Sequence, residues 1–202
     1  MKPIAIYGAG SLGQEVLVMI RQINEYHPEW EPIGFFDDDP SVGDNIDGLR
    51  LLGGINDLNQ YVDKLNVIVA LGNPAVRKRI VNKINNPLVS YPIIIHPGVQ
   101  LKPYQRCHIG EGSIIAAGNI LTVGISIGRH VILNMACTVG HDVRIGDYTS
   151  IMPNCIISGG AQIGSDCFIG AGAAIMNRVE ISPATRIRSR EFVNFESPKI
   201  LG

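Results

Sequence analysis

The sequence predicts two units of different fold class, an α/β unit over residues 1–95 and a parallel β-helix over residues 96–192. In the first half, short apolar segments alternate with segments of helical periodicity. In the second half, an aliphatic residue recurs at every sixth position and the dipeptide Ile-Gly recurs every eighteen residues. The first pattern is typical of a parallel sheet with helices, and the second of stacked coils. Residues 193–202 follow and are expected to form a C-terminal tail.

The elements of the first half follow one another in a clear order. PIAIYG predicts a short buried strand, and GQEVLVMIRQI places four aliphatic residues on one helical face, Val16, Leu17, Ile20 and Ile23. EPIGFFDDD predicts a second strand that runs into acidic residues, and INDLNQYV predicts a short helix. NVIVALG predicts a third strand, and NPAVRKRIVNKI predicts a helix with Asn73 as its cap and Pro74 in its first turn.

The turn after the first strand indicates a nucleotide site. GAGSLG matches G-x-G-x-x-G at Gly8, Gly10 and Gly13, a turn that brings main-chain N–H groups and a helix N-terminus close to a phosphate. The aspartates 37–39 follow the second strand, where an NAD site keeps its ribose-binding carboxylate. However, residues 1–95 suffice for only one half of a Rossmann-like sheet, so a nucleotide attached to a sugar fits better than NAD. A tight turn that binds nothing is the remaining alternative.

The second half is an internal repeat. Written in sixes from residue 109, it gives IGEGSI, IAAGNI, LTVGIS, IGRHVI, LNMACT, VGHDVR, IGDYTS, IMPNCI, ISGGAQ, IGSDCF, IGAGAA, IMNRVE, ISPATR and IRSREF. Every first place is Ile, Leu or Val, and most fifth places are small. Ile-Gly stands at 109, 127, 145 and 163, so three sixes make one coil. Stacked triangular coils would bury the first places as a continuous aliphatic column.

The cysteines belong to this repeat. They stand at 107, 137, 155 and 167, always at the fifth place of a six, which predicts small buried apolar residues instead of a disulfide or metal framework. No two of the five histidines are separated by a multiple of eighteen. This spacing argues against the γ-class carbonic anhydrases, whose β-helices need three histidines converging on zinc. No metal is therefore expected.

Composition excludes several classes of partner. The formal net charge is −1, and the 17 Lys and Arg residues are spread along the chain, so no basic stripe is available for nucleic acid or an anionic membrane. The N-terminal MKPIAIYGAG is too short and glycine-rich for a signal peptide, and no apolar span long enough for a membrane helix follows. A cytoplasmic protein without nucleic acid or membrane partners is expected.

The repeat resembles the hexapeptide-repeat acyltransferases, whose prism is a left-handed parallel β-helix. Together the two halves resemble the bacterial sugar acetyltransferases of the sialic acid O-acetyltransferase and UDP-4-amino-sugar N-acetyltransferase type. This resemblance rests on YGAGSLGQEV, GFFDDD, VIVALGNPAVRKRI, IIHPGV and GHDVRIGDY. It implies an enzyme that moves acetyl from acetyl-CoA to an amine or hydroxyl of a nucleotide-activated sugar. It also implies a homotrimer with acetyl-CoA between adjacent β-helices.

The resemblance assigns roles in the first half. The diphosphate of the nucleotide sugar would lie against Gly10, Ser11 and Gly13. The nucleoside would contact the neighbouring acidic run through Asp37 and Asp38. The site would be completed by three residues after the third strand, Gly72, Asn73 and Arg77. Arg77 would pair with phosphate as a fixed cation, and an ordinary exposed helix arginine is the alternative.

In the second half, the resemblance assigns the base to His141. This residue stands at the third place of its six, and counting in eighteens puts Gly159 and Asn177 above it. It would remove the proton of the attacking amine or hydroxyl, for which a neutral imidazole is suited. Asp142 would orient the ring, and Gly159, Gly160 and Asn177 would lie beside acetyl-CoA. An ordinary surface histidine and a solvated turn carboxylate are the alternatives.

Three departures from the family pattern keep other functions open. Leu12 and Ser150 stand where the family often carries histidine, and SREFVNFESPKILG lacks the glycine- and proline-rich ending that commonly closes the coenzyme site. One alternative is a non-catalytic trimeric scaffold that binds a nucleotide sugar or NAD. Another is an acyltransferase with a different donor or a non-sugar acceptor.

Overall fold

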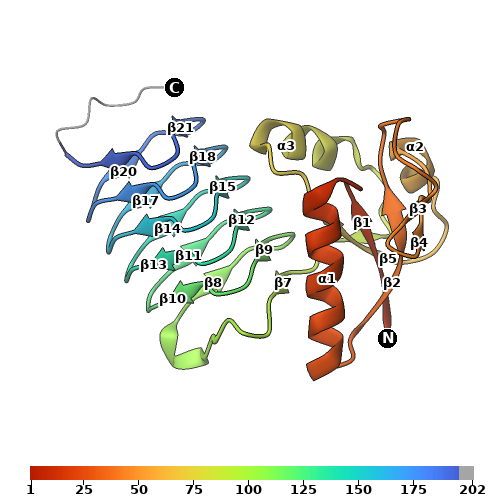
Figure 1. Ribbon diagram of the computed structural model, residues 1–202, viewed down its shortest axis with the longest axis horizontal. Coiled ribbons are helices and arrows are strands. Elements are labelled where there is room, and N and C mark those ends of the chain that lie inside the picture. The colour runs from red at the N-terminus through yellow and green to blue at the C-terminus, as the bar shows by residue number, and fades with distance from the viewer. Residues whose placement is uncertain (196–202) are drawn as a thin grey trace. The chain divides into compact units, whose positions relative to one another are not determined.

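The computed structural model describes residues 1–195, so most of the predicted tail lies outside the described residues. The chain divides into two compact units, Met1–Ile94 and the part that begins at Ile95. The first is a parallel α/β unit and the second a parallel three-sheet β-helix (Figure 1), which confirms both predicted fold classes.

The N-terminal unit is built on one parallel sheet of order β2-β1-β5-β6. Its strands are β1 (Lys2–Tyr7), β2 (Trp30–Phe36), β5 (Leu65–Val69) and β6 (Val89–Ser90). The helices are α1 (Ser11–Tyr26), α2 (Ile55–Asn59) and α3 (Pro74–Lys83). Apolar residues of the central strands and of α2 and α3 form the core, including Val67, Leu58 and Ile80. On α1, the predicted Val16, Leu17 and Ile20 are buried, whereas Ile23 is half-buried.

One element of this unit was not expected from the sequence. Strands β3 (Asn45–Ile46) and β4 (Leu49–Arg50) form an antiparallel hairpin. Its two turn residues, Asp47 and Gly48, have φ angles of 51° and 86°. Asp-Gly is a common pair in such a turn because both positions need a left-handed backbone, so a sequence signal was present.

The β-helix has three sheets, called the β8, β9 and β10 sheets after the three strands of its first coil. The β8 sheet contains β8 (His108–Ile109), β11 (Ser126–Ile127), β14 (Arg144–Ile145), β17 (Gln162–Ile163) and β20 (Glu180–Ile181). The β9 sheet contains β7 (Ile94–Ile95), β9 (Ile114–Ile115), β12 (Ile132–Leu133), β15 (Ser150–Ile151), β18 (Phe168–Ile169) and β21 (Arg186–Ile187). The β10 sheet contains β10 (Ile120–Leu121), β13 (Thr138–Val139), β16 (Ile156–Ile157), β19 (Ala174–Ile175) and β22 (Phe192–Val193). A short 3-10 helix, η1 (Pro103–Gln105), precedes β8.

The predicted register of this unit is confirmed. From β8 onward, every paired residue is eighteen positions from its partner, as Ile127 is from Ile145 and Leu133 is from Ile151. The first places of the sixes form one continuous buried core. Cys137, Cys155 and Cys167 are buried in this core, Cys107 is half-buried, and all four are free thiols.

The corners between sheets depend on the fourth place of the six. Non-glycine residues at this place, including Ala136, Asp142 and Asn154, have φ between 52° and 63°. The left-handed conformation is uncommon for residues with a Cβ, and here it turns the chain from one sheet to the next.

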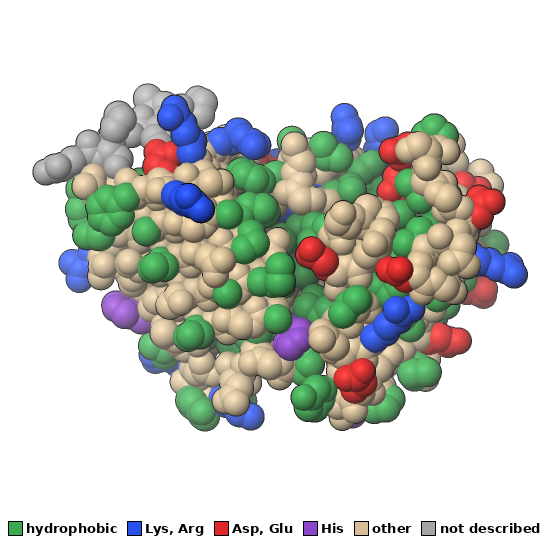
Figure 2. Space-filling view, in the orientation of Figure 1, with side chains coloured by type: hydrophobic (Ala, Val, Ile, Leu, Met, Phe, Trp, Pro, Cys, Tyr) green, Lys and Arg blue, Asp and Glu red, His purple; other side chains and the backbone are tan. Residues whose placement is uncertain are grey.

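Charged side chains are dispersed on the one face that Figure 2 shows. On the face shown in Figure 2, Lys and Arg side chains are separated by polar and apolar ones and form no continuous stripe. Within residues 1–195, no helix has the length and hydropathy needed to cross a membrane.

Candidate functional site

His141 and Asp142 form a hydrogen-bonded pair on the corner between β13 and β14. Nδ1 of His141 lies 2.9 Å from Oδ2 of Asp142, and the two side chains are 63% and 71% exposed. The main-chain N–H of Asp142 donates to the carbonyl of Val123 in the preceding coil at 2.9 Å, which anchors the carboxylate in the turn. A carboxylate at Nδ1 favours the tautomer with hydrogen on that nitrogen. Nε2 is then the nitrogen that can accept a proton.

The residues predicted to stand above His141 do so. The main-chain N–H of Gly160 donates to the carbonyl of His141 at 2.7 Å, and that of Arg178 donates to the carbonyl of Gly159 at 3.1 Å. The imidazole lies over Gly159, because a Cβ added there would be 2.5 Å from Nε2. Counting in eighteens therefore located this column correctly.

A surface groove of about 760 Å³ runs along this column. All five residues predicted for this corner line it, His141, Asp142, Gly159, Gly160 and Asn177. It also contains Arg144, Gln162 and Arg178, which the sequence analysis missed. The same period could have found them, because Arg144 and Gln162 precede the inward residues of β14 and β17, and Arg178 stands eighteen positions after Gly160.

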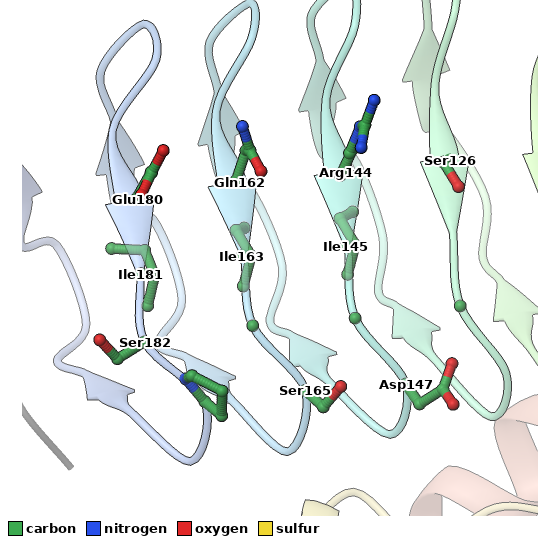
Figure 3. Close-up of a pocket in the computed structure, with 14 residues that line it drawn as sticks. Ser126, Arg144, Ile145, Asp147, Gln162, Ile163, Ser165, Glu180, Ile181 and Ser182 are labelled. Atoms are coloured by element: carbon green, nitrogen blue, oxygen red, sulfur yellow. The ribbon is translucent and has the colours of Figure 1, made fainter.

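A second groove of about 630 Å³ follows the β8 sheet on the other side of the row formed by Arg144 and Gln162 (Figure 3). Arg144 and Gln162 line both grooves. At the opposite corner of the second groove, Asp147 pairs with Arg129, with 3.2 Å between Oδ2 and Nη2. Two grooves thus share one row of polar side chains beside the histidine.

In the N-terminal unit, the glycine loop combines packing constraints with an open position. A Cβ on Gly13 would overlap the carbonyl oxygen of Gly8, and Gly8 itself has a φ of 106°. A Cβ on Gly10, in contrast, would meet no atom within 4 Å. Gly10 is the N-cap of α1, and no side chain caps this helix. The loop therefore presents uncapped main-chain N–H groups at a helix N-terminus, which favour an anion.

The acidic run holds neighbouring segments together. Asp37 accepts a hydrogen bond from the main-chain N–H of Ala9 at 2.8 Å, which ties the second strand to the glycine loop. Asp38 accepts from the main-chain N–H of Ile55 at 2.8 Å, at the start of α2. Beneath them, burial raises the pKa of Tyr7, and the adjacent Asp38 and Asp37 raise it further. These structural roles of Asp37 and Asp38 were not expected from the sequence.

The loop after β5 completes the carboxyl edge of the sheet. Asn73 caps α3 as predicted, since its Oδ1 accepts from the N–H groups of Ala75 and Val76 at 3.0 and 3.3 Å. A Cβ on Gly72 would lie 3.9 Å from Leu12 in the glycine loop. This edge lies where the strand order reverses about β1, the usual ligand position in open parallel sheets.

Arg77 is not the exposed helix arginine of the alternative prediction. It is fully buried, and its guanidinium donates to the carbonyl of Leu71. This geometry favours a role in fixing the loop that carries Gly72 and Asn73. Ser150, which replaces a family histidine, is also fully buried on β15. Across the described part of the chain, no cluster of three or more His, Cys, Asp or Glu side chains is suited to hold a metal.

Comparison with known proteins identifies similar proteins for both units. The family model for the PglD N-terminal domain matches residues 3–84, and the model for the bacterial transferase hexapeptide (six repeats) matches residues 145–177. GDP-perosamine N-acetyltransferase from Escherichia coli O157:H7 is 30% identical over 171 residues, which cover 82% of this chain and 76% of that protein.

Two solved structures are similar over nearly the whole chain. One is the acetyltransferase domain of PglB from Neisseria gonorrhoeae FA1090 in complex with acetyl coenzyme A, with a TM-score of 0.83, 26% identity and coverage of 94% of this chain and 89% of that one. The other is PerB from Caulobacter crescentus in complex with CoA and GDP-perosamine, with a TM-score of 0.84, 25% identity and coverage of 96% and 89%.

Proposed function

Because this chain belongs to the PglD-type hexapeptide-repeat sugar N-acetyltransferases and is an acetyl-CoA-dependent sugar N-acetyltransferase, we propose that His141 is its general base. The observation that carries the proposal is the hydrogen bond from Nδ1 of His141 to Asp142, which leaves Nε2 available in a groove. The acceptor is the amine of a nucleotide-activated amino sugar. The cytoplasm is the proposed location.

The proposed reaction uses Nε2 of His141 for one proton transfer. The amine nitrogen attacks the thioester carbonyl carbon and forms the new C–N bond, while Nε2 takes the proton of the amine. The C–S bond of the tetrahedral intermediate then breaks, and the leaving thiolate receives that proton. Asp142 stabilises the imidazolium that exists between these transfers. No step of this sequence requires a metal ion.

The acetyl-CoA site is proposed along the column above His141, with Gly159, Gly160 and Asn177. Within residues 1–195, no acceptor takes the main-chain N–H of Gly159. The N–H of Arg129, at the same place of its six, donates outward to Asp147 of the next coil at 2.8 Å. The N–H of Gly159 is therefore a suitable donor to the oxyanion. Arg144 and Arg178 supply positive charge to the same groove.

The nucleotide sugar is proposed to bind at the carboxyl edge of the N-terminal sheet. The diphosphate would lie against Gly10, Ser11 and Gly13, where the open side of Gly10 and the uncapped N-terminus of α1 support the proposal. Asp37 and Asp38 would contact the nucleoside through the remaining lone pairs of their carboxylates, since both oxygens of Asp37 already accept main-chain N–H groups, those of Ala9 and Asp39. Gly72 and Asn73 border the same edge, with Arg77 as their buried support.

A homotrimer is proposed from an apolar stripe on the β10 sheet. Ile120, Ile156 and Phe192 are 60%, 53% and 58% exposed, and they share one outward column with Thr138 and Ala174. Exposed apolar stripes of this kind mark association surfaces. Because His141 follows β13 of this sheet, association would place a second copy beside the groove.

Ile156→Lys should dissociate the trimer in analytical ultracentrifugation and abolish activity without unfolding the coil. Activity in a monomeric fraction would contradict the shared site.

The test of the function is thiol release from acetyl-CoA with UDP-, GDP-, dTDP- and CMP-linked amino sugars. We expect one sugar to support turnover and His141→Ala to lower kcat by about 10²–10⁴-fold. Full activity of His141→Ala would remove the base from the proposal. No turnover with any sugar would favour a nucleotide-sugar scaffold, and turnover only with another acyl thioester would identify a different donor.

A further inference from the structure

Gly159 is exceptional among the residues at its place in the repeat. It is the only glycine at the third place of the fourteen sixes, and every other third place carries a side chain. Alanine stands there twice, at Ala117 and Ala171. The φ angle of Gly159 lies outside the left-handed region. The corner turn therefore accepts a Cβ at this place, and backbone conformation does not explain the glycine.

The imidazole of His141 explains it. A Cβ on Gly159 would lie 2.5 Å from Nε2 and 2.8 Å from both Cδ2 and Cε1. Carbon atoms pack at about 3.5–4.0 Å, so the ring and a Cβ cannot occupy these positions together. All three nearest atoms belong to the ring of His141, and none belongs to the backbone of a neighbouring coil.

Gly124 leaves space for the carboxylate of Asp142, as Gly159 does for the ring of His141. In the coil before His141, a Cβ on Gly124 would lie 2.6 Å from Oδ1 of Asp142. Gly124 has a φ of 69°, but Ala136 and Asn154 adopt the same conformation at the same place of their sixes. The hydrogen-bonded pair is thus bordered by a glycine on each side along the stack, and neither glycine is required by its turn.

We propose that Gly159 is a positioning residue for the base, a role that rests on the proposed function of His141. Its missing side chain lets the imidazole lie against the next coil with Nδ1 on Asp142 and Nε2 in the groove. Because the ring is 63% exposed, a Cβ at 159 would push it into solvent without displacing the backbone. Relief of the overlap requires a movement of about 1 Å, and a displacement of that size costs about 10²-fold in rate.

The test compares Gly159→Ala in the wild-type and His141→Ala backgrounds. We expect Gly159→Ala to lower kcat by about 10²-fold and to change the ring ¹⁵N and ¹H signals of His141. The affinity for coenzyme A should stay within about two-fold in calorimetry, because alanine keeps the main-chain N–H that is proposed to face the donor. In the His141→Ala background, the same substitution should change neither coenzyme A affinity nor melting temperature. Gly118→Ala is a control on another corner, where the nearest atoms to a new Cβ are 3.6 Å away, and it should retain activity.

Two results would overturn the proposal. Unchanged kcat and unchanged ring signals in Gly159→Ala would show that the ring does not depend on this space. An equal loss of coenzyme A affinity in both backgrounds would assign Gly159 to the donor instead of the base. Failure of the proposed function is distinguishable, because an active His141→Ala enzyme would remove the base while the ring signals still report whether Gly159 positions the imidazole.

Discussion

The two units use glycine for different physical reasons. In the N-terminal unit, Gly13 has no side chain because the carbonyl of Gly8 occupies that space, so the constraint is between two backbones. In the β-helix, Gly159 has no side chain because the ring of His141 occupies that space, and the ring can rotate away. Filling the first space opposes folding, whereas filling the second moves a functional group. A glycine is informative about function when its neighbour is a mobile side chain.

The largest expected effect tests the backbone side of this comparison. Gly13→Ala forces α1 away from the loop after β1, and we expect a loss of about 3 kcal/mol in the free energy of unfolding. Gly10→Ala is the matched variant, because a Cβ there meets no atom within 4 Å. It should cost no more than about 1 kcal/mol of stability, since alanine is a poorer N-cap than glycine, and should raise KM for the nucleotide sugar. Denaturant unfolding and steady-state kinetics measure both. Equal stability of the two variants would contradict the packing argument.

The next effect concerns the orientation of the ring. Asp142→Asn keeps the size of the side chain but allows its NH₂ group to face Nδ1, which favours the tautomer with hydrogen on Nε2. Because Asp142 is 71% exposed, water competes for the ring, and we expect kcat to fall by about 10–100-fold with little change in melting temperature. The control is Glu191→Gln. Glu191 lies at another turn, where its carboxylate accepts a hydrogen bond from the N–H of Arg188. A fully active Asp142→Asn enzyme would make Asp142 an ordinary turn residue.

A smaller effect is expected at the cap of α3. Asn73→Ala removes the acceptor for the N–H groups of Ala75 and Val76 and should cost about 1 kcal/mol of stability. Asn73→Asp retains a capping oxygen and should have the stability of the wild-type protein. If Asn73 also contacts the nucleotide sugar, the aspartate variant will keep its stability but raise KM, because the new charge faces a diphosphate. Unchanged KM in both variants would limit Asn73 to capping.

The smallest effect is a difference in reactivity between the buried thiols of Cys137 and Cys167 and the half-buried thiol of Cys107. The pKa of Cys137 is raised by its hydrogen bond with Cys155 and by burial. Burial also raises the pKa of Cys167. Since the thiolate is the reactive form, neither should react with iodoacetamide in the native protein near neutral pH, whereas the half-buried Cys107 should react slowly. Mass spectrometry after labelling checks this. Rapid labelling of Cys137 would indicate that the coil opens.

Prediction succeeded in the β-helix because its register is a local property. Once three sixes make a coil, the residue above His141 follows by counting, and the groove does contain Gly159 and Asn177. Arg144 and Arg178 obey the same eighteen-residue period, but they stand at outward positions, which the aliphatic column of first places does not mark. Phe195, also in this groove, stands after the last complete coil and has no such signal.

Prediction was less complete in the α/β unit because its contacts join distant segments. Nothing local indicates that Asp38 accepts from the start of α2 or that Asp37 holds the glycine loop. The burial of Arg77 likewise depends on the loop that carries Leu71. The capping role of Asn73, in contrast, was visible in the sequence because a cap and its helix are adjacent.

The sequence by itself determined both fold classes, the eighteen-residue register and the column that carries His141, because each depends on periods that the backbone imposes locally. Only the tertiary structure decided which acidic oxygens are already used, that Arg77 is buried, and that the ring of His141 fills the space beside Gly159. These features depend on the direction of individual side chains and on packing between segments far apart in the chain. The sequence supplies the residues for such contacts, but packing selects among their directions.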